Sequence, residues 1–102
     1  MIRPRYRTDA NQHAVVDALL GAGCSVQTLA AVGAGCPDLL VASPSGVMFL
    51  IEVKMPGTVD RHDPTRQKQI KWAKHWQGPV HVIETADEAL ILAQQYAKKE
   101  IR

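Results

Sequence analysis

The sequence is poor in cysteine and has no long apolar run. Cys24 and Cys36 are its only two cysteines, which excludes a disulfide framework, and because both adjoin apolar segments we expect small buried thiols. No apolar run approaches the roughly 20 residues that a membrane-spanning helix needs. The basic residues 1–7 lack the apolar core of a signal peptide. We therefore expect a cytoplasmic protein with no membrane partner.

Motifs of several common enzyme classes are also absent. The four histidines form no zinc-binding spacing with one another or with cysteine. No G-x-S-x-G sequence supports a serine hydrolase, and no G-x-G-x-x-G sequence marks a dinucleotide site. Gly33 and Gly35 precede an expected strand and no Gly-Lys-Ser/Thr follows them, which excludes a P-loop. We expect no nucleotide cofactor.

Charge is nearly balanced, with a net value of +2 that is too small to indicate a polyanionic partner by itself. Its distribution is more informative, because basic residues concentrate in residues 1–7 and again in residues 61–74. Such local clusters are what phosphate contact requires, although a charged stretch can equally be a solvated face. The nucleic-acid-binding candidates in the second cluster are Arg61, Arg66, Lys68 and Lys71. The length predicts one domain, residues 9–102, preceded by a basic arm, residues 1–8.

The most informative stretch reads as a β-hairpin. Two apolar runs, residues 38–43 and 47–51, flank Pro44-Ser45-Gly46, which is turn chemistry. If Ser43 pairs with Val47, paired residue numbers sum to 90, and Asp38 lies directly opposite Glu52. Lys54 then shares a face with Glu52, since side chains alternate along a strand.

This register predicts two carboxylates and one ammonium group at one end of an apolar hairpin. At about 4 Å and an effective dielectric constant near 20, two carboxylates repel by roughly 4 kcal/mol. Lys54 offsets part of this repulsion and a divalent cation offsets more, because Mg²⁺ prefers carboxylate, water and phosphate oxygens. The alternative interpretation is a surface salt bridge between Lys54 and one of the carboxylates.

The remaining pattern alternates helices with strands. We expect helices over residues 9–20 and 66–76, strands over 25–30 and 79–83, and a final helix capped by Thr85 or Asp87. Both faces of the hairpin are apolar, which predicts a strand pair buried on both sides. Trp72 and Trp76 are interpreted as core anchors in preference to base-stacking groups. Gln69 leads their helix face and is expected to point toward the carboxylates, with Gln67 as the alternative.

These residues carry a resemblance to a known nuclease family. Pro37-Asp38, a spacer and Glu52-Val53-Lys54 resemble the PD-(D/E)xK signature. The wider series, with Gln69 on a helix and then Gly78-Pro-Val-His-Val-Ile, resembles the VRR-NUC (virus-type replication-repair nuclease) branch, near the Holliday-junction resolvases. The resemblance implies an α/β restriction-endonuclease-like core, αβββαβ(α), with a mixed central sheet flanked by helices.

The resemblance also implies a function and a site. It implies a Mg²⁺- or Mn²⁺-dependent endodeoxyribonuclease acting on branched or duplex DNA as a homodimer, in a bacterium or a phage-infected host. Asp38, Glu52 and the Val53 carbonyl would bind metal, while Lys54 and Gln69 would complete the catalytic set. The family's first helix often adds an acidic or amide group, for which the candidates are Asp9, Gln12 and Asp17. The alternatives are a nucleic-acid-binding module without turnover and a purely structural domain.

Overall fold

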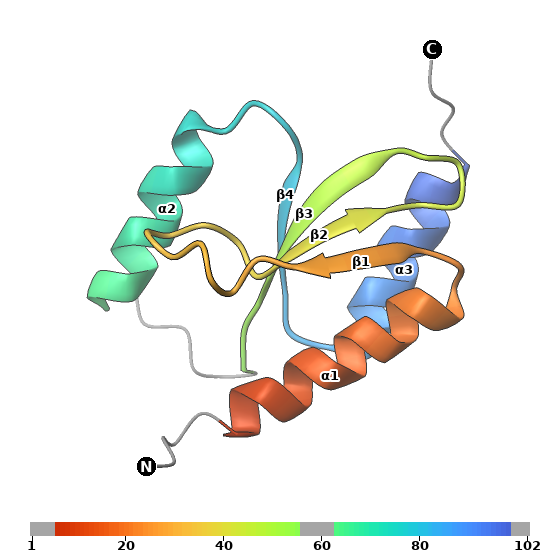
Figure 1. The fold of residues 1–102 in the computed structure, drawn as a ribbon, viewed down its shortest axis with the longest axis horizontal. Helices are drawn as coiled ribbons and strands as arrows, with labels where there is room; N and C mark the ends of the chain where they lie inside the picture. Colours follow the sequence, from red (N-terminus) through yellow and green to blue (C-terminus); the bar gives the residue numbers. More distant parts are fainter. Residues whose placement is uncertain (1–5, 56–62, 99–102) are drawn as a thin grey trace.

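A computed structural model describes residues 6–55 and 63–98. Its elements, in chain order, are α1 (Tyr6–Gly21), β1 (Ser25–Thr28), β2 (Leu39–Ala42), β3 (Met48–Val53), α2 (Pro64–His75), β4 (Val80–Ile83) and α3 (Ala86–Ala97) (Figure 1). This is the order predicted from the sequence. Among the described residues, no helix has the length and apolar character needed to cross a bilayer.

The four strands form one mixed sheet in the order β1-β2-β3-β4. β2 pairs with its neighbours β1 and β3 in antiparallel fashion, and β3 pairs with β4 in parallel. The hairpin register is the predicted one, because Leu39 pairs with Ile51 and Ala42 with Met48. The turn closes through a hydrogen bond from Ser43 N–H to the Val47 carbonyl at 2.9 Å, and Gly46 has a positive φ of 89°.

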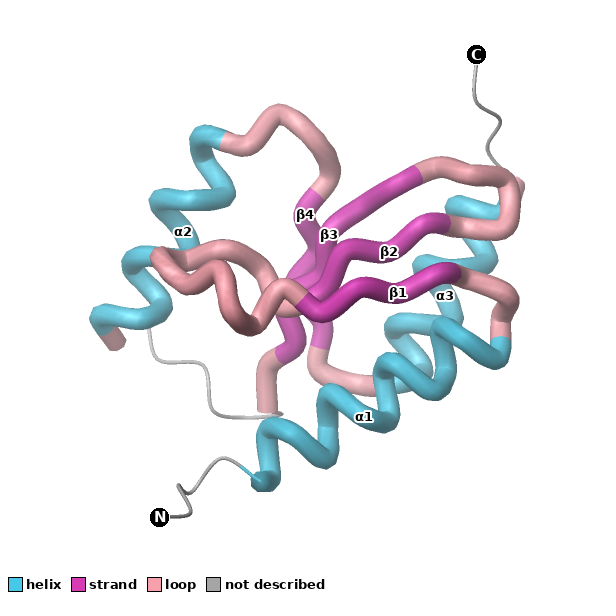
Figure 2. The backbone as a smooth tube through the Cα atoms, in the orientation of Figure 1, coloured by secondary structure: helices cyan, strands magenta, loops and turns pink. Residues whose placement is uncertain are grey.

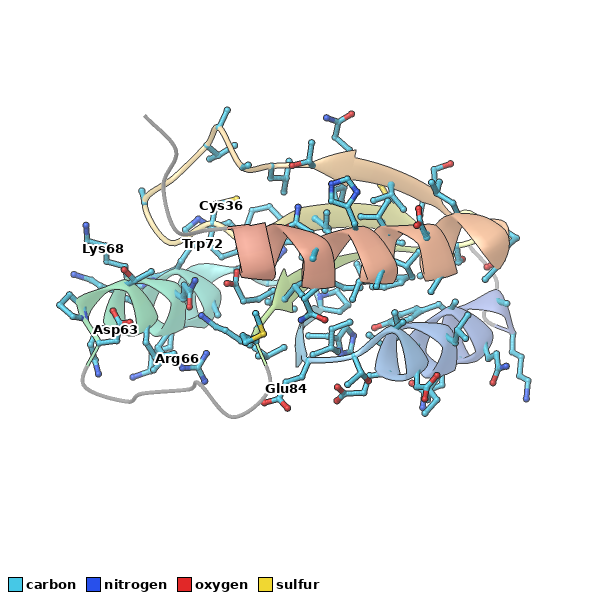
Figure 3. All side chains as sticks on the ribbon, turned by 90° about the horizontal axis from the view of Figure 1, so that it is seen from below. Cys36, Asp63, Arg66, Lys68, Trp72 and Glu84 are labelled. Atoms are coloured by element: carbon cyan, nitrogen blue, oxygen red, sulfur yellow. The ribbon has the colours of Figure 1, made fainter. Side chains whose placement is uncertain are left out.

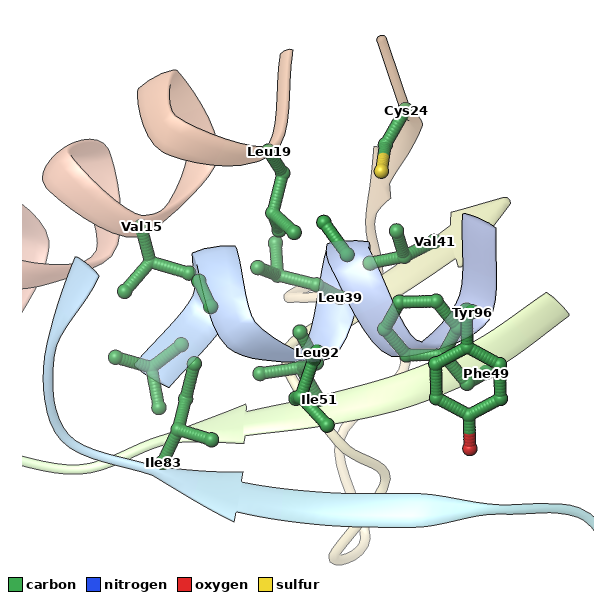
Figure 4. Close-up of a cluster of buried hydrophobic side chains, with 13 residues drawn as sticks. Val15, Leu19, Cys24, Leu39, Val41, Phe49, Ile51, Ile83, Leu92 and Tyr96 are labelled. Carbon is green, nitrogen blue, oxygen red and sulfur yellow. The ribbon is translucent and has the colours of Figure 1, made fainter. Parts of the chain in front are cut away.

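One face of the sheet is buried against α1 and α3 (Figure 4). Val15 and Leu19, one helical turn apart on α1, point at this face, and neither has any exposed surface. Phe49 of β3 stacks on Tyr96 of α3 with ring centroids 4.1 Å apart. The alternating residues of the hairpin therefore build the core, which orients Glu52, one position removed from Ile51, toward the opposite face.

The opposite face is covered only in part, so the prediction of burial on both sides is wrong for half of the hairpin. Met48, near the turn, has 60% of its surface exposed, whereas Leu50 has 4% and Glu52 has 5%. Cover is confined to the Glu52 end, where α2 and the loop of residues 29–37 lie side by side (Figure 2). The open end of the face lacks an element to pack on it within the described residues, because α2 lies beyond the strand ends.

Two helix starts differ from their predicted positions. α1 begins at Tyr6 instead of Asp9, so Asp9 lies within its first turn and is not the residue that precedes the helix. Residues 6–8 are therefore helical and not part of an extended arm, while residues 1–5 lie outside the described residues. α2 begins at Pro64, where proline fits the first helical position, and Asp63 caps it by accepting a hydrogen bond from Thr65 N–H.

Other boundaries are closer to expectation. β1 ends at Thr28, two residues early, although Leu29 N–H still donates to the Asp38 carbonyl at 2.8 Å. Thr85 caps α3 in a capping box with Glu88, which decides between the two predicted caps. Both cysteines are free thiols: Cys24 is buried in the core as predicted, and Cys36 is half-buried in the loop.

Candidate active site

Asp38 is positioned by the end of the hairpin. It precedes β2, and the register places it opposite Glu52. Its Oδ2 atom accepts a hydrogen bond from Val53 N–H at 2.8 Å, and its backbone carbonyl accepts one from Leu29 N–H. The carboxylate is thereby fixed across the strands by the backbone of β3, which makes its position a direct consequence of the hairpin register.

Glu52 is a buried carboxylate on β3. Its Oε2 atom accepts a hydrogen bond from Gln69 Nε2 at 2.6 Å and lies 3.4 Å from Lys54 Nζ. Its Oε1 atom is buried and has no hydrogen-bond partner among the described residues. Burial, assisted by the negative charge of Asp38, raises the pKa of Glu52 to about 7, against the opposing effect of the Lys54 charge.

Lys54 and Gln69 close this cluster from two different elements. The Lys54 ammonium group, just after β3, donates to Gln69 Oε1 on α2. The Gln69 amide thus joins Lys54 to Glu52, with its oxygen facing the cation and its nitrogen facing the carboxylate. Gln67, the alternative considered from the sequence, is exposed.

A close contact between the backbone of the β1–β2 loop and that of α2 fixes how near α2 lies to Glu52 and Lys54. Gly35, with φ of 87°, lies so near α2 that a Cβ atom there would be 2.4 Å from the Lys68 carbonyl oxygen. Only glycine fits at such a separation. The glycine-containing loop between β1 and β2 therefore packs directly against α2 and fixes the position of the helix that carries Gln69.

Among the described side chains of α1, Asn11 reaches this end of the sheet, and sequence reasoning missed it. Its Nδ2 group donates to the backbone carbonyls of Lys54 and Glu84, both at 2.9 Å, and so ties together the chain segments that leave β3 and β4. The sequence feature that could have indicated Asn11 is its spacing. Asn11, Val15 and Leu19 lie at i, i+4 and i+8, so Asn11 belongs to the core-facing stripe of the helix. Buried polar groups in such positions need partners.

Of the three α1 candidates, the two whose side chains are described do not join the cluster. Gln12 lines a separate cavity with Thr28 and Leu39, under the core face of the sheet. Asp17 is exposed. Asp9 lies in the first turn of α1, and its side chain is outside the part of the structure that is described.

The basic candidates separate into two groups. Arg66 is half-buried and lines a cavity of about 340 Å³ together with Glu52 and Gln69, and its charge lowers the pKa of Glu52. Lys68 and Lys71 are exposed, and Lys68 leaves the opposite side of α2 from Arg66 (Figure 3). Arg61 lies outside the described residues.

The donor set fits a hard divalent cation that keeps part of its water shell. Two carboxylates face each other, and the orphaned Glu52 Oε1 atom is a buried acceptor in need of a positive partner. Mg²⁺ is commonly held by one or two carboxylates plus water and phosphate oxygens. Within residues 6–55 and 63–98, no group of three or more His, Cys, Asp or Glu side chains is placed to hold a metal, so an all-protein zinc site does not fit there.

Comparison with known proteins supports the family seen in the motif. A solved structure described as a "VRR_NUC domain" superposes on this chain with a TM-score of 0.62, at 26% sequence identity, over 86% of this chain and 95% of that chain. No protein-family model matches the sequence, and no curated protein matches it. The structural match supports a VRR-NUC nuclease domain assignment, and the mixed four-stranded sheet with its helices is consistent with the restriction-endonuclease-like fold.

Proposed function

We propose that this chain, a VRR-NUC domain by its fold, is a metal-dependent DNA endonuclease that hydrolyses phosphodiester bonds. The observation that carries the proposal is the buried Glu52 carboxylate, opposite Asp38, with one oxygen lacking a hydrogen-bond partner among the described residues. A structural salt bridge with Lys54 would not need a second carboxylate in the same place. A cation-binding site does.

The contacts support the roles of the side chains, and the resemblance to the PD-(D/E)xK signature adds the Val53 carbonyl. Asp38, Glu52 and the Val53 carbonyl would hold Mg²⁺ or Mn²⁺, which when bound lowers the pKa of a water molecule and stabilises charge on the phosphate. Lys54, oriented by Gln69, would orient the attacking water or help to deprotonate it, the latter as the neutral amine, and as the ammonium ion it would neutralise charge at the scissile phosphate. Gln69 acts as the positioning group between Lys54 and Glu52. The products are a 5′-phosphate and a 3′-hydroxyl.

Branched DNA, such as a Holliday junction or a flap, is the proposed substrate, and the cytoplasm is the proposed place of action. The test is a cleavage assay with Mg²⁺ and with Mn²⁺ on branched and linear DNA, run beside Asp38→Ala. Cleavage by the wild type and none by the variant is the expected result. Binding of DNA without cleavage in either metal would instead favour the second candidate, a nucleic-acid-binding module on the same fold.

The exposed lysines of α2 are expected to contact the DNA backbone. Each phosphate neutralised adds about 0.9 to the slope of log K against log salt concentration for duplex DNA. Replacing Lys68 and Lys71 together with glutamine should therefore lower the slope by roughly 2. Duplex affinity measured by fluorescence anisotropy between low and physiological salt gives the slope.

Lys98→Gln, at the C-terminal end of α3 and therefore on another element, is the control, and its slope should match the wild type. An unchanged slope in the double variant would mean that this side of α2 does not touch the backbone.

A homodimer is the expected working form, because a domain of 102 residues offers little surface for gripping a branched substrate. Light scattering at micromolar concentration should return about twice the chain mass of 11.2 kDa. A monomeric mass together with full cleavage of four-way junctions would contradict this expectation.

A further inference from the structure

Trp72 and Trp76 form an aromatic pair on the surface of α2. Their rings stack with centroids 4.8 Å apart at an interplanar angle of 20°. Trp76 has 49% of its surface exposed, and none of the α2 residues, all of them in the described part of the chain, is buried. The expectation that both tryptophans anchor the core is wrong. Trp72 is half-buried and Trp76 is exposed, and an aromatic pair that is partly at the surface favours a partner outside the chain.

The surroundings of the pair are cationic. A cavity of about 340 Å³ opens between the loop, at Ala34, and the α2 side chains Lys68, Lys71, Trp72, His75 and Trp76. Residues 64–76 contain no Asp or Glu. Exposed aromatic rings flanked by lysines are the chemistry that binds single-stranded nucleic acid, where rings stack on bases and cations contact phosphates. Charge complementarity therefore favours a polyanion with accessible base faces over a protein partner.

Two close backbone contacts, at Gly35 and at Gly78, adjoin residues that line this cavity. Gly35 presses against the Lys68 carbonyl on one side, and Ala34 beside it has a φ of 56°, an uncommon value for a residue other than glycine. On the other side, a Cβ atom at Gly78 would lie 2.9 Å from Trp76 Nε1, so the indole rests directly on the Gly78 backbone. The Trp76 ring is thus held by Trp72 on one face and by Gly78 near its nitrogen, and 49% of the residue surface stays exposed.

The pair lies next to the proposed cleavage site. Gln69, which donates a hydrogen bond to Glu52, precedes Trp72 of α2 by three residues and Trp76, the residue that caps the C-terminal end of α2, by seven. With a rise of about 1.5 Å per residue, the rings lie about 5 to 10 Å along the helix axis from Gln69. Stacked nucleotides advance about 3.4 Å each along one strand. The rings therefore fall about one to three nucleotides along a strand from Gln69, which contacts the proposed site.

We infer that the Trp72–Trp76 pair is a stacking site for unpaired bases, with Lys68, Lys71 and His75 contacting the phosphates of the same strand. This inference rests on the proposed nuclease function and narrows its substrate class to DNA that presents unpaired bases beside the cleaved bond. A fully paired duplex buries its base faces and cannot occupy the rings in this way.

The chain offers an internal reporter for the test, since Trp72 and Trp76 are its only tryptophans. Intrinsic tryptophan fluorescence is titrated with a short oligothymidylate and with a duplex of the same length, in EDTA so that nothing is cleaved. The single strand should quench the fluorescence more strongly than the duplex. Trp76→Leu should lower the affinity for the single strand about tenfold and the affinity for the duplex much less, because base stacking on one ring is lost. Trp76→Phe keeps a ring and should retain most of the affinity.

The matched control is Ile91→Ala, which removes an exposed apolar side chain from α3, with 53% of its surface accessible, and should leave both affinities unchanged. Equal single-strand affinities for the wild type and Trp76→Leu would overturn the inference. So would a fall in light-scattering mass in Trp76→Leu with DNA binding intact, which would make the pair a contact between two copies of the chain. Binding is measured without metal, so the two proposals can fail separately. If the wild type does not cleave DNA but Trp76→Leu still lowers the affinity for the single strand, the nuclease proposal is refuted and the stacking site is supported.

Discussion

Glu52→Gln is expected to reduce DNA cleavage about a thousandfold while leaving the fold intact. The substitution keeps the shape of the side chain and an oxygen that can accept from Gln69, but it removes the negative charge that would hold the cation. Loss of metal-assisted stabilisation of the transition state costs several kcal/mol, and each 1.36 kcal/mol is a factor of ten in rate. Nicking rates on branched and linear DNA in Mg²⁺ and in Mn²⁺, with circular dichroism for the fold, give the comparison.

Substitutions of Asp38 and Lys54 should also abolish cleavage, whereas substitution of Asp17 on α1 should not. Asp38→Asn and Lys54→Ala are expected to lose cleavage as well, because Asp38 faces Glu52 and Lys54 bonds Gln69. Asp17→Asn removes an exposed carboxylate from α1 and should cleave at the wild-type rate. Full activity in Glu52→Gln would refute the proposed mechanism, whatever the fold.

The part of the site that could be predicted is the part that is local in sequence. The turn Pro44-Ser45-Gly46 fixes the hairpin register, and the register alone brings Asp38 opposite Glu52 and puts Lys54 on the same face. The approach of Gln69 followed from its place on a helix that leads back to the strand ends. The pairing of the carboxylates uses the turn and the period of a strand, whereas the choice of Gln69 over Gln67 also used the family resemblance.

The part that could not be predicted depends on how the elements are packed. Asn11 bonds two backbone carbonyls from β3 and β4 segments 43 and 73 residues away, and no periodicity shows where those carbonyls lie. Trp72 and Trp76 have core-like spacing, yet α2 has no sheet face beneath them because the loop of residues 29–37 holds it beyond the strand ends. Met48 and Leu50 are both apolar and lie on the same face of β3, but only Leu50 is buried by other residues.

The same buried carboxylate should cost the metal-free protein stability as pH rises. In the folded state Glu52 holds its proton up to about pH 7, whereas the ordinary value is 4.5, so between these values the folded state binds more protons than the unfolded state. The free energy of unfolding then falls as pH rises through this window, and above pH 7 the penalty reaches about 3 kcal/mol. Burial and Asp38 oppose the charge, while Lys54 and Arg66 favour it.

Glu52→Gln should therefore melt higher than the wild type in EDTA at pH 8, by about 10 to 20 °C for a domain of this size, and the difference should shrink toward pH 5. Taking the difference between the two proteins cancels the titration of groups they share. Mg²⁺ should reduce the difference in melting temperature by stabilising the wild type. A ligand at a hundredfold excess over Kd stabilises the folded protein by about 2.7 kcal/mol, and the variant has lost the charge that binds the cation. Thermal melts of both proteins from pH 5 to 8, with EDTA and with millimolar Mg²⁺, measure both effects. Equal melting temperatures in every condition would mean that Glu52 carries no buried charge and that the two carboxylates do not share a cation.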